Sequence, residues 1–374
     1  MKKVLFTAKV DSHIINFHIP YLKWFKDKGY EVHVASNGNE YIPYVDKKFN
    51  LPFDRNPFKA TNIKSYNELK DIINKNEYEL IHCHTPIAGV LTRLASKKAR
   101  KNGTKVLYTV HGFHFYKGGS KLNWIIFYPI EKWLARYVDC IITINEHDYN
   151  LTKEKKFKCK DIRLVNGVGV DLERFNPINM ESKDRLRKNL GYNKEDFILV
   201  YVAELNENKN QDMAIKAMNI LKDIIPNIKL LLVGEGVSKE GYLREIDTLG
   251  LNDKVILLGH RKDVNDLLKL SDIAISTSKR EGLPRNIMEA MATGVPIVVT
   301  NCRGNSDLIE DGSNGYIVDI NDDKGLATRI KKIYDNPNIS KDFGESSLKK
   351  VKLYELPKVL KDMEDIYISY VKNY

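Results

Sequence analysis

The chain has 374 residues, 43% hydrophobic and 29% charged, which is enough to bury an extensive core and to form more than one domain. No window reaches the roughly 18 unbroken apolar residues of a membrane-spanning helix, and the basic start of the chain indicates a first strand rather than a signal peptide. The four cysteines lack CxxC spacing and suggest no disulfide framework, so we expect a reducing, cytoplasmic setting.

The net charge of +11 is unevenly distributed. Residues 1–179 carry 30 Lys and Arg against 18 Asp and Glu, whereas the remainder carries 30 against 31. The basic first half suits an anionic membrane surface or a phosphorylated acceptor, but a solvated lysine-rich surface explains the charge equally well. We expect no nucleic-acid partner, because the positive charge is spread without a recognisable binding module.

Short runs rich in Val, Ile and Leu alternate with helical segments along the whole chain. We predict first-half strands at residues 2–10, 30–37, 80–85, 105–112, 140–145 and 161–167. We predict second-half strands at residues 197–205, 228–236, 254–260, 273–278, 296–301 and 315–320. Nearly continuous apolar runs are typical of strands buried on both faces, and intervening amphipathic helices such as 18–29 and 211–224 predict parallel sheets.

Twelve strands are too many for one ordinary sheet. The polar segment 174–196, with Pro177 and Gly191, precedes a new strand and marks a boundary. We therefore predict an α/β protein of two doubly wound, Rossmann-like parallel-sheet domains facing across a cleft. The domains span residues 1–177 and 178–355, and a C-terminal helix over 356–374 packs back on the first. Ligands of such sheets bind beyond the carboxyl ends of the strands.

The most informative strand end is followed by EGLPRNIMEAMATGVP, residues 281–296. Pro284 and Gly294 delimit a predicted helix over Arg285–Thr293. The amino end of that helix offers free N–H groups and a partial positive charge, which suit a diphosphate. Gly282 allows a ligand to approach the backbone closely.

Two acids flank this helix start, and each has a place on a nucleotide sugar. Glu289, one turn into the helix, can accept hydrogen bonds from vicinal ribose hydroxyls, and Glu281 can meet a second polyol. Lys209, after a neighbouring strand, can neutralise phosphates. Either glutamate alone reads more simply as a surface or helix-start residue, but the combination at this spacing favours a nucleotide diphosphate linked to a sugar.

The segment EGLPRNIMEAMATGVPIV resembles the Glu-x7-Glu signature of glycosyltransferase family 4, a family of retaining enzymes with the GT-B fold. Similar segments occur in the same order at residues 165–175, 202–215, 231–264 and 302–318. The likeness covers most of the second half and is looser in the first, where it rests on YTVHG and on strand order. In detail the sequence resembles bacterial enzymes that build capsule, exopolysaccharide or lipid-linked glycans, often from UDP-N-acetylhexosamines.

The resemblance implies that residues 1–177 bind the acceptor and residues 178–355 the donor. It implies that Glu289 holds the ribose, that Glu281 lies near the sugar hydroxyls, and that Lys209 binds phosphate. It places His111 at the mouth of the acceptor side. The remaining donor-binding candidates are Gly282, Leu283, Pro284, Arg285 and Asn286 at the sugar and phosphates, and His260, Arg261 and Lys262 at the base.

Two positions depart from the family pattern. Glu204 stands where an arginine commonly grips the diphosphate, so either Lys209 and the helix start suffice or Arg280, Arg285 or Arg303 substitutes. The first strand is followed by VDSHIINFH instead of a Gly-Gly turn, which removes an expected backbone contact to the diphosphate.

The implied reaction transfers a hexose or N-acetylhexosamine from a UDP-sugar to a lipid-linked or oligosaccharide acceptor with retention. We expect no metal or other cofactor, because the chain has no Asp-x-Asp. His82 and His84 share one strand face, but no Cys or His at helical spacing adds a third ligand, so a metal site is disfavoured.

A UDP-sugar epimerase and a non-catalytic sugar-nucleotide-binding protein remain alternatives, whereas a nicotinamide dehydrogenase is disfavoured because no G-x-G-x-x-G follows a strand. The aromatic, basic segment 121–139 is interpreted as a helix covering the first sheet. Its exposed side leaves peripheral attachment to the inner face of the plasma membrane open.

Overall fold

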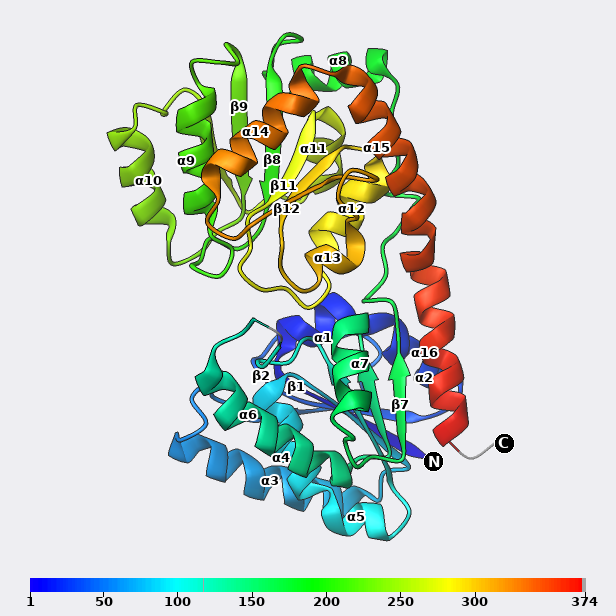
Figure 1. Cartoon of the computed structure of the whole chain (residues 1–374). Coiled ribbons are helices and arrows are strands. Elements are labelled where there is room, and N and C mark those ends of the chain that lie inside the picture. Colours follow the sequence, from blue (N-terminus) through cyan, green and yellow to red (C-terminus); the bar gives the residue numbers. More distant parts are fainter. Residues whose placement is uncertain (117, 372–374) are drawn as a thin grey trace. The chain divides into compact units, whose positions relative to one another are not determined.

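The computed structural model describes residues 1–116 and 118–371, and these form two compact units (Figure 1). The first unit comprises Met1–Val168 together with the C-terminal segment from Pro357, and the second comprises Gly169–Leu356. The units therefore divide earlier in the chain than residue 177. The cause is local: Val170 pairs with Glu355, and its N–H donates to the Tyr354 carbonyl, so the chain joins the second unit there.

The first unit is built on a seven-stranded sheet whose paired strands all run parallel, in the order β3-β2-β1-β4-β5-β6-β7. Its strands are β1 (Lys3–Val10), β2 (Glu31–Asn37), β3 (Lys47–Asn50), β4 (Leu80–His84), β5 (Lys105–Val110), β6 (Cys140–Thr143) and β7 (Asp161–Leu164). The predicted parallel sheet is confirmed, but β3 was missed. It is a short edge strand, KKFN, and an edge strand with one apolar residue carries no hydrophobic run.

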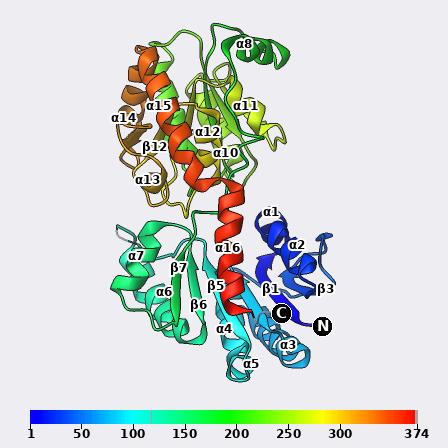
Figure 2. The same cartoon turned by 90° about the vertical axis from the view of Figure 1, so that its right-hand side faces the viewer.

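Helices cover both faces of this sheet, as the continuous apolar strands require. They are α1 (Asp11–Phe17), α2 (Ile19–Asp27), α3 (Ala60–Asn76), α4 (Pro86–Ala95), α5 (Lys97–Lys101), α6 (Lys121–Leu134), α7 (Glu146–Glu154) and α16 (Leu356–Tyr370). One core joins α1, α2 and α16 to the strand side chains of one face, and Figure 2 shows α16 running along the first unit. Side chains of α3 and α4 pack on the opposite face.

The second unit has a six-stranded parallel sheet in the order β10-β9-β8-β11-β12-β13. Its strands are β8 (Phe197–Val202), β9 (Ile228–Val233), β10 (Val255–Gly259), β11 (Ile273–Ser276), β12 (Ile297–Thr300) and β13 (Tyr316–Val318). These six are the strands predicted for the second half.

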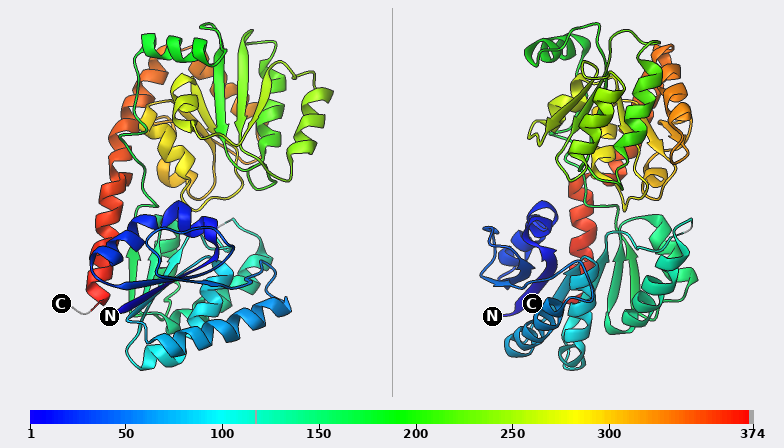
Figure 3. Two further views of the ribbon diagram at one scale, coloured as in Figure 1. Left: turned by 180° about the vertical axis from the view of Figure 1, so that it is seen from behind. Right: turned by 90° about the vertical axis from the view of Figure 1, so that its left-hand side faces the viewer.

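Its helices are α8 (Met180–Asn189), α9 (Gln211–Leu221), α10 (Lys239–Thr248), α11 (Val264–Leu270), α12 (Arg285–Thr293), α13 (Asn305–Leu308), α14 (Asp323–Tyr334) and α15 (Pro337–Lys350). The apolar sides of α9, α10 and α14 pack into one core with the sheet, and Figure 3 shows them from two sides. None of the helices within the described residues combines the length and apolar character needed to cross a bilayer.

In each sheet the strands are first added on one side of the first strand and then on its other side, so the strand order reverses at one point. It lies between β1 and β4 in the first unit and between β8 and β11 in the second. The loops at the carboxyl ends of these strand pairs diverge and leave room for a ligand. A ligand site is therefore expected at each of these strand ends.

Candidate functional site

In the second unit, hydrogen bonds to backbone carbonyls tie the loops after β8 and β11 together. The Lys279 N–H donates to the Asn208 carbonyl at 2.8 Å, and the Asn208 side-chain amide donates to the Arg280 carbonyl at 2.9 Å. The Tyr201 hydroxyl, at the end of β8, donates to the Lys209 carbonyl at 2.6 Å. This network fixes the loop from residue 203 to residue 210 against the loop that carries the sequence signature.

The same network brings together two residues that are far apart in sequence. Lys209 Nζ lies 2.6 Å from Glu281 Oε1, and the two side chains are only 21% and 11% exposed. A cation and an acid meet at the point where the strand order reverses. The cation can exchange its carboxylate partner for an anionic ligand, and the acid is then left to accept hydrogen bonds.

Helix α12 begins directly after this loop, and its amino end has no side-chain cap. Pro284 is the N-cap residue, so it contributes no side-chain acceptor, and the first intrahelical bond runs from the Met288 N–H to the Pro284 carbonyl. The Asn286 side-chain amide donates to the Val202 carbonyl at 2.9 Å and anchors the helix start to the end of β8. Gly294, at φ 70°, ends the helix. The predicted helix bounds are confirmed.

Glu289 is almost entirely buried, with 8% of its surface exposed. Its carboxylate accepts a hydrogen bond from Arg285 Nε at 2.9 Å, one helical turn earlier. Burial raises the pKa of Glu289, and the positive charge of Arg285 opposes that rise. A buried carboxylate with one arginine partner keeps acceptor capacity for further hydrogen bonds.

The loop that carries the sequence signature, residues 277–284, is also contacted by the segment after β12 and is called the signature loop below. Arg303 Nε donates to the Glu281 carbonyl at 3.0 Å. Gly304 has φ 84°, and a Cβ there would lie 2.7 Å from the Gly282 carbonyl oxygen. Only glycine therefore allows these two loops to approach so closely. Arg303 thus supports the loop through its backbone.

The remaining donor-side candidates separate into two groups. Leu283 is buried, and Arg280 is half-buried with its carbonyl used by Asn208, so both lie in the tied loops. His260 is exposed after β10, and Arg261 pairs with Asp263 in its own loop, with Nε 2.8 Å from Oδ1.

Glu204 and Lys262, near these loops, each use the backbone carbonyl as a hydrogen-bond acceptor. Glu204, in the position of the family arginine, is exposed, and its carbonyl accepts from Gln211 at 2.9 Å. The Lys262 carbonyl accepts from Arg174 at 2.9 Å. Asn208 was not singled out in the sequence, although its position immediately before Lys209 is a signal that could have found it.

His111 lies in the first unit, immediately after β5. Its Nε2 lies 3.4 Å from Nδ1 of His84, and burial lowers the pKa of His111 to about 4. His82, by contrast, is bonded by Tyr367 and Thr109, each at 2.8 Å, and packs in the core. His82 and His84 do lie side by side, with ring centroids 4.0 Å apart, but His84 also belongs to a separate group of histidines. That group includes His13 and His18, which helical spacing did not reveal.

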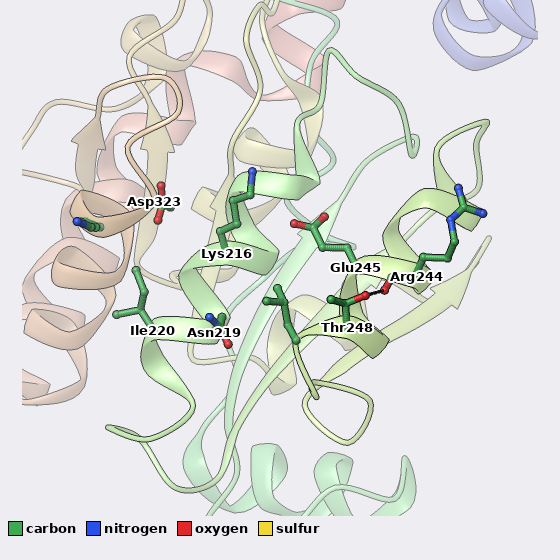
Figure 4. Close-up of a pocket in the computed structure, with 9 residues that line it drawn as sticks. Lys216, Asn219, Ile220, Arg244, Glu245, Thr248 and Asp323 are labelled. Carbon is green, nitrogen blue, oxygen red and sulfur yellow. Dashed lines mark hydrogen bonds between the residues drawn. The ribbon is translucent and has the colours of Figure 1, made fainter.

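A hollow of about 510 Å³ lies elsewhere on the second unit, on the helical layer formed by α9, α10 and the start of α14 (Figure 4). The Thr248 hydroxyl donates to the Arg244 carbonyl within it, at 2.8 Å. Burial and nearby Asp212 raise the pKa of Glu245 to about 7. The hollow is lined from helix flanks, away from the strand ends, and neither α12 nor the signature loop contributes to it. We therefore place the candidate site at the strand ends.

Comparisons with known proteins identify the family of the chain. The family described as glycosyl transferases group 1 matches residues 182–350, and the glycosyl transferase 4-like family matches residues 3–145. EpsD of Bacillus subtilis, which is named as a glycosyltransferase, is 44% identical over 99% of this chain and 97% of its own. An Escherichia coli UDP-Gal:alpha-D-GlcNAc-diphosphoundecaprenol alpha-1,3-galactosyltransferase is 28% identical over 85% of this chain and 82% of its own.

A solved structure of HepE from Anabaena, in complex with UDP and glucose, covers 99% of this chain and 100% of its own, with a TM-score of 0.80 and 19% identity. This likeness shows the GT-B fold. The chain belongs to the glycosyltransferases of group 1 and the glycosyltransferase 4-like type, and it is a transferase enzyme.

Proposed function

We propose that this glycosyltransferase moves a hexose or an N-acetylhexosamine from a UDP-sugar to a lipid-linked or oligosaccharide acceptor, with retention, in the synthesis of capsule, exopolysaccharide or another cell-surface glycan. The observation that carries the donor assignment is the Lys209–Glu281 pair beside the uncapped start of α12. HepE, the Anabaena protein with the same fold, was solved with UDP and glucose, which supports UDP as the nucleotide.

The donor is held by complementary groups of the second unit. The N–H groups at the start of α12 and the ammonium group of Lys209 receive the diphosphate, and Glu289 accepts from the ribose hydroxyls. Glu281, released from Lys209, accepts from hydroxyls of the transferred sugar. Gly282 and Leu283 present backbone to the sugar, Arg280 adds positive charge to the loop, and His260 and Arg261 meet the base.

The chemical step breaks the bond between the anomeric carbon and the diphosphate oxygen. Charge grows on the leaving diphosphate, where the helix start and Lys209 stabilise it. The acceptor hydroxyl attacks from the face that the diphosphate leaves, and its proton passes to a diphosphate oxygen. Glu281 binds hydroxyls and forms no covalent bond. His111, on the first unit, is proposed to contact the acceptor. Lys209 and the helix amides supply the stabilising charge without a metal ion at the diphosphate.

The first unit is proposed to dock on an anionic membrane surface, where lipid-linked acceptors reside. Helix α6 exposes an apolar stripe at helical spacing, formed by Leu122, Ile125, Ile126, Ile130 and Trp133. Its other aromatic residues, Trp124, Phe127 and Tyr128, pack against the core, so the sheet-covering role and the exposed apolar side coexist. Basic side chains such as Lys97, which lies 5.0 Å from the Trp133 ring, flank the stripe. We place the protein in the cytoplasm, on the inner face of the plasma membrane.

The test is incubation of the protein with radiolabelled UDP-N-acetylglucosamine, and in parallel with other UDP-sugars, together with a lipid-linked glycan. Label in the lipid fraction, dependent on Lys209, supports the proposal. Release of a free epimeric sugar supports the epimerase alternative, and binding without any turnover supports the non-catalytic one. Inversion at the anomeric carbon of the product would contradict the retaining mechanism.

A further inference from the structure

Four histidines gather at the first sheet, at the point between β1 and β4 where the strand order reverses. His13 lies in α1 directly after β1, and His18 is the residue between α1 and α2. His84 ends β4, and His111 follows β5. The fold thus joins residues from three separate stretches of the sequence, since His13 and His18 are five residues apart. Such a strand end is where an α/β sheet accommodates a ligand.

The nitrogen atoms of these side chains converge. One ring nitrogen from each of the four histidines lies within 4.8 Å of the corresponding atom of every other. The His18 and His84 rings stack with centroids 3.8 Å apart, and the His13 and His111 rings meet edge to face at 4.6 Å. A single small ligand could therefore reach all four.

Several of these buried nitrogens have no hydrogen-bond partner in the described parts of the chain. They are Nε2 of His13, both ring nitrogens of His18 and Nε2 of His84. His18 is only 3% exposed and His84 is fully buried. A buried polar atom without a partner is costly, so it calls for an explanation.

Other buried histidines of the same unit provide a contrast. Both ring nitrogens of His82 have partners, and so do both ring nitrogens of His33, which bonds to Tyr78 and Glu31. Ordinary core packing in this unit thus satisfies its histidines. The group around His18 is different, since several of its ring nitrogens have no hydrogen-bond partner among the described residues.

A cavity of about 20 Å³ adjoins the group and is lined by His18, His84 and His111, together with His82 and mainly apolar neighbours. His13 lies beside this cavity and does not line it. Space of this size holds roughly one water molecule or one metal ion. Desolvation, aided by the neighbouring histidines, also lowers the pKa of His18 and of His84 well below the ordinary value. Neutral imidazole is the form that coordinates metals.

We propose that His13, His18, His84 and His111 bind one divalent transition-metal cation, with Zn²⁺ as the preferred ion. Imidazole nitrogen suits Zn²⁺ and its neighbours, whereas Mg²⁺ and Ca²⁺ demand oxygen ligands. Four nitrogens at about 2.0 Å from a tetrahedral ion lie about 3.3 Å apart. Binding therefore requires the stacked rings to turn inward, and the ion ties α1 and α2 to the ends of β4 and β5.

Ligation uses one ring nitrogen of each histidine. The other nitrogen of His111 stays available for the acceptor contact proposed above, and a metal-bound imidazole commonly donates its second N–H. The metal site does not depend on the donor site in the second unit, so either proposal can fail without the other.

The test uses the full chain, purified without a histidine tag, stripped with a chelator and then titrated with Zn²⁺ and with Co²⁺. We expect about one ion per chain, the visible absorption of Co²⁺ in a tetrahedral nitrogen site, and a higher unfolding temperature with Zn²⁺. His13→Asn and His18→Asn should each weaken binding about tenfold or more. His147→Asn, a half-buried histidine outside the group, should bind as the wild type does.

His13→Asn should disturb folding less than His18→Asn, because the His13 side chain is half-buried and that of His18 is buried. Circular dichroism shows whether both variants are folded. A stripped wild type that takes up neither ion would overturn the proposal. So would a folded His13→Asn chain that binds Co²⁺ with the affinity and spectrum of the wild type, since the ion would then be held elsewhere.

Discussion

Replacing Glu281 by glutamine should tighten the binding of UDP while it impairs sugar transfer. In the structure, Glu281 forms an ion pair with Lys209, the cation that the diphosphate needs, with Oε1 2.6 Å from Nζ. Glutamine keeps an acceptor for the ammonium group but removes the negative charge. Lys209 is then released more readily to the diphosphate, whereas the transferred sugar loses a charged acceptor.

The size of the effect follows from the geometry of the pair. Two unit charges at 2.6 Å attract each other by about 2 kcal/mol in bulk water and about 6 kcal/mol at an effective dielectric constant near 20. Desolvation offsets much of this, and hydrogen bonds to charged groups contribute about 1.5–3 kcal/mol net. Recovering about 1.4 kcal/mol corresponds to roughly tenfold tighter UDP binding.

Isothermal titration calorimetry with UDP measures this directly, and the initial rate of transfer measures the loss of activity. Lys209→Met should weaken UDP binding, and the double variant should show no gain over Lys209→Met alone. Glu181→Gln, which removes the charge of an exposed pair with Arg185 on α8, is the control and should leave affinity unchanged. Weaker UDP binding by Glu281→Gln, or a gain that persists without Lys209, would refute the reasoning.

Three further outcomes are expected. Burial raises the pKa of Glu289, so its carboxylate takes up a proton at a higher pH than an ordinary glutamate does. UDP affinity should therefore fall as the pH is lowered through this raised pKa, and Glu289→Gln should remove that fall. Equal dependence of UDP affinity on pH in the two proteins would exclude this role. Ile125→Glu should reduce sedimentation with anionic vesicles, whereas Ile63→Glu, at a similarly exposed position on α3, should not; matching losses would indicate non-specific attachment. Transfer rates with and without added Mg²⁺ or Mn²⁺ should agree, and an absolute requirement for either ion would contradict stabilisation by Lys209 and the helix start.

Much of the second unit could be predicted because the signals for each helix and strand lie within its own segment of the sequence. Strands buried on both faces appear as apolar runs, and Pro284 and Gly294 mark the start and the end of α12. The pairing of Lys209 with Glu281 could be expected only in outline. It depends on β8 lying beside β11, which is a property of strand order and not of any segment.

The first unit was harder to predict for the same reason. Edge strand β3 has almost no apolar signal, so only its pairing with β2 identifies it. The histidine group combines the ends of three strands with a helix junction, and the distances in sequence between His18, His84 and His111 carry no periodicity. Helical and strand spacing detects ligands on one element, whereas this group is assembled by the sheet.

The measurement that bears most directly on the donor site is a calorimetric titration of UDP into the wild type and into Glu289→Ala, with Glu181→Ala as the control. We expect the wild type to bind one UDP per chain, and the loss of the ribose acceptor to cost about 2 kcal/mol, or roughly thirtyfold in affinity. The control should match the wild type. A wild type that does not bind UDP, or a Glu289→Ala chain that binds it equally well, would contradict the placement of the nucleotide at α12.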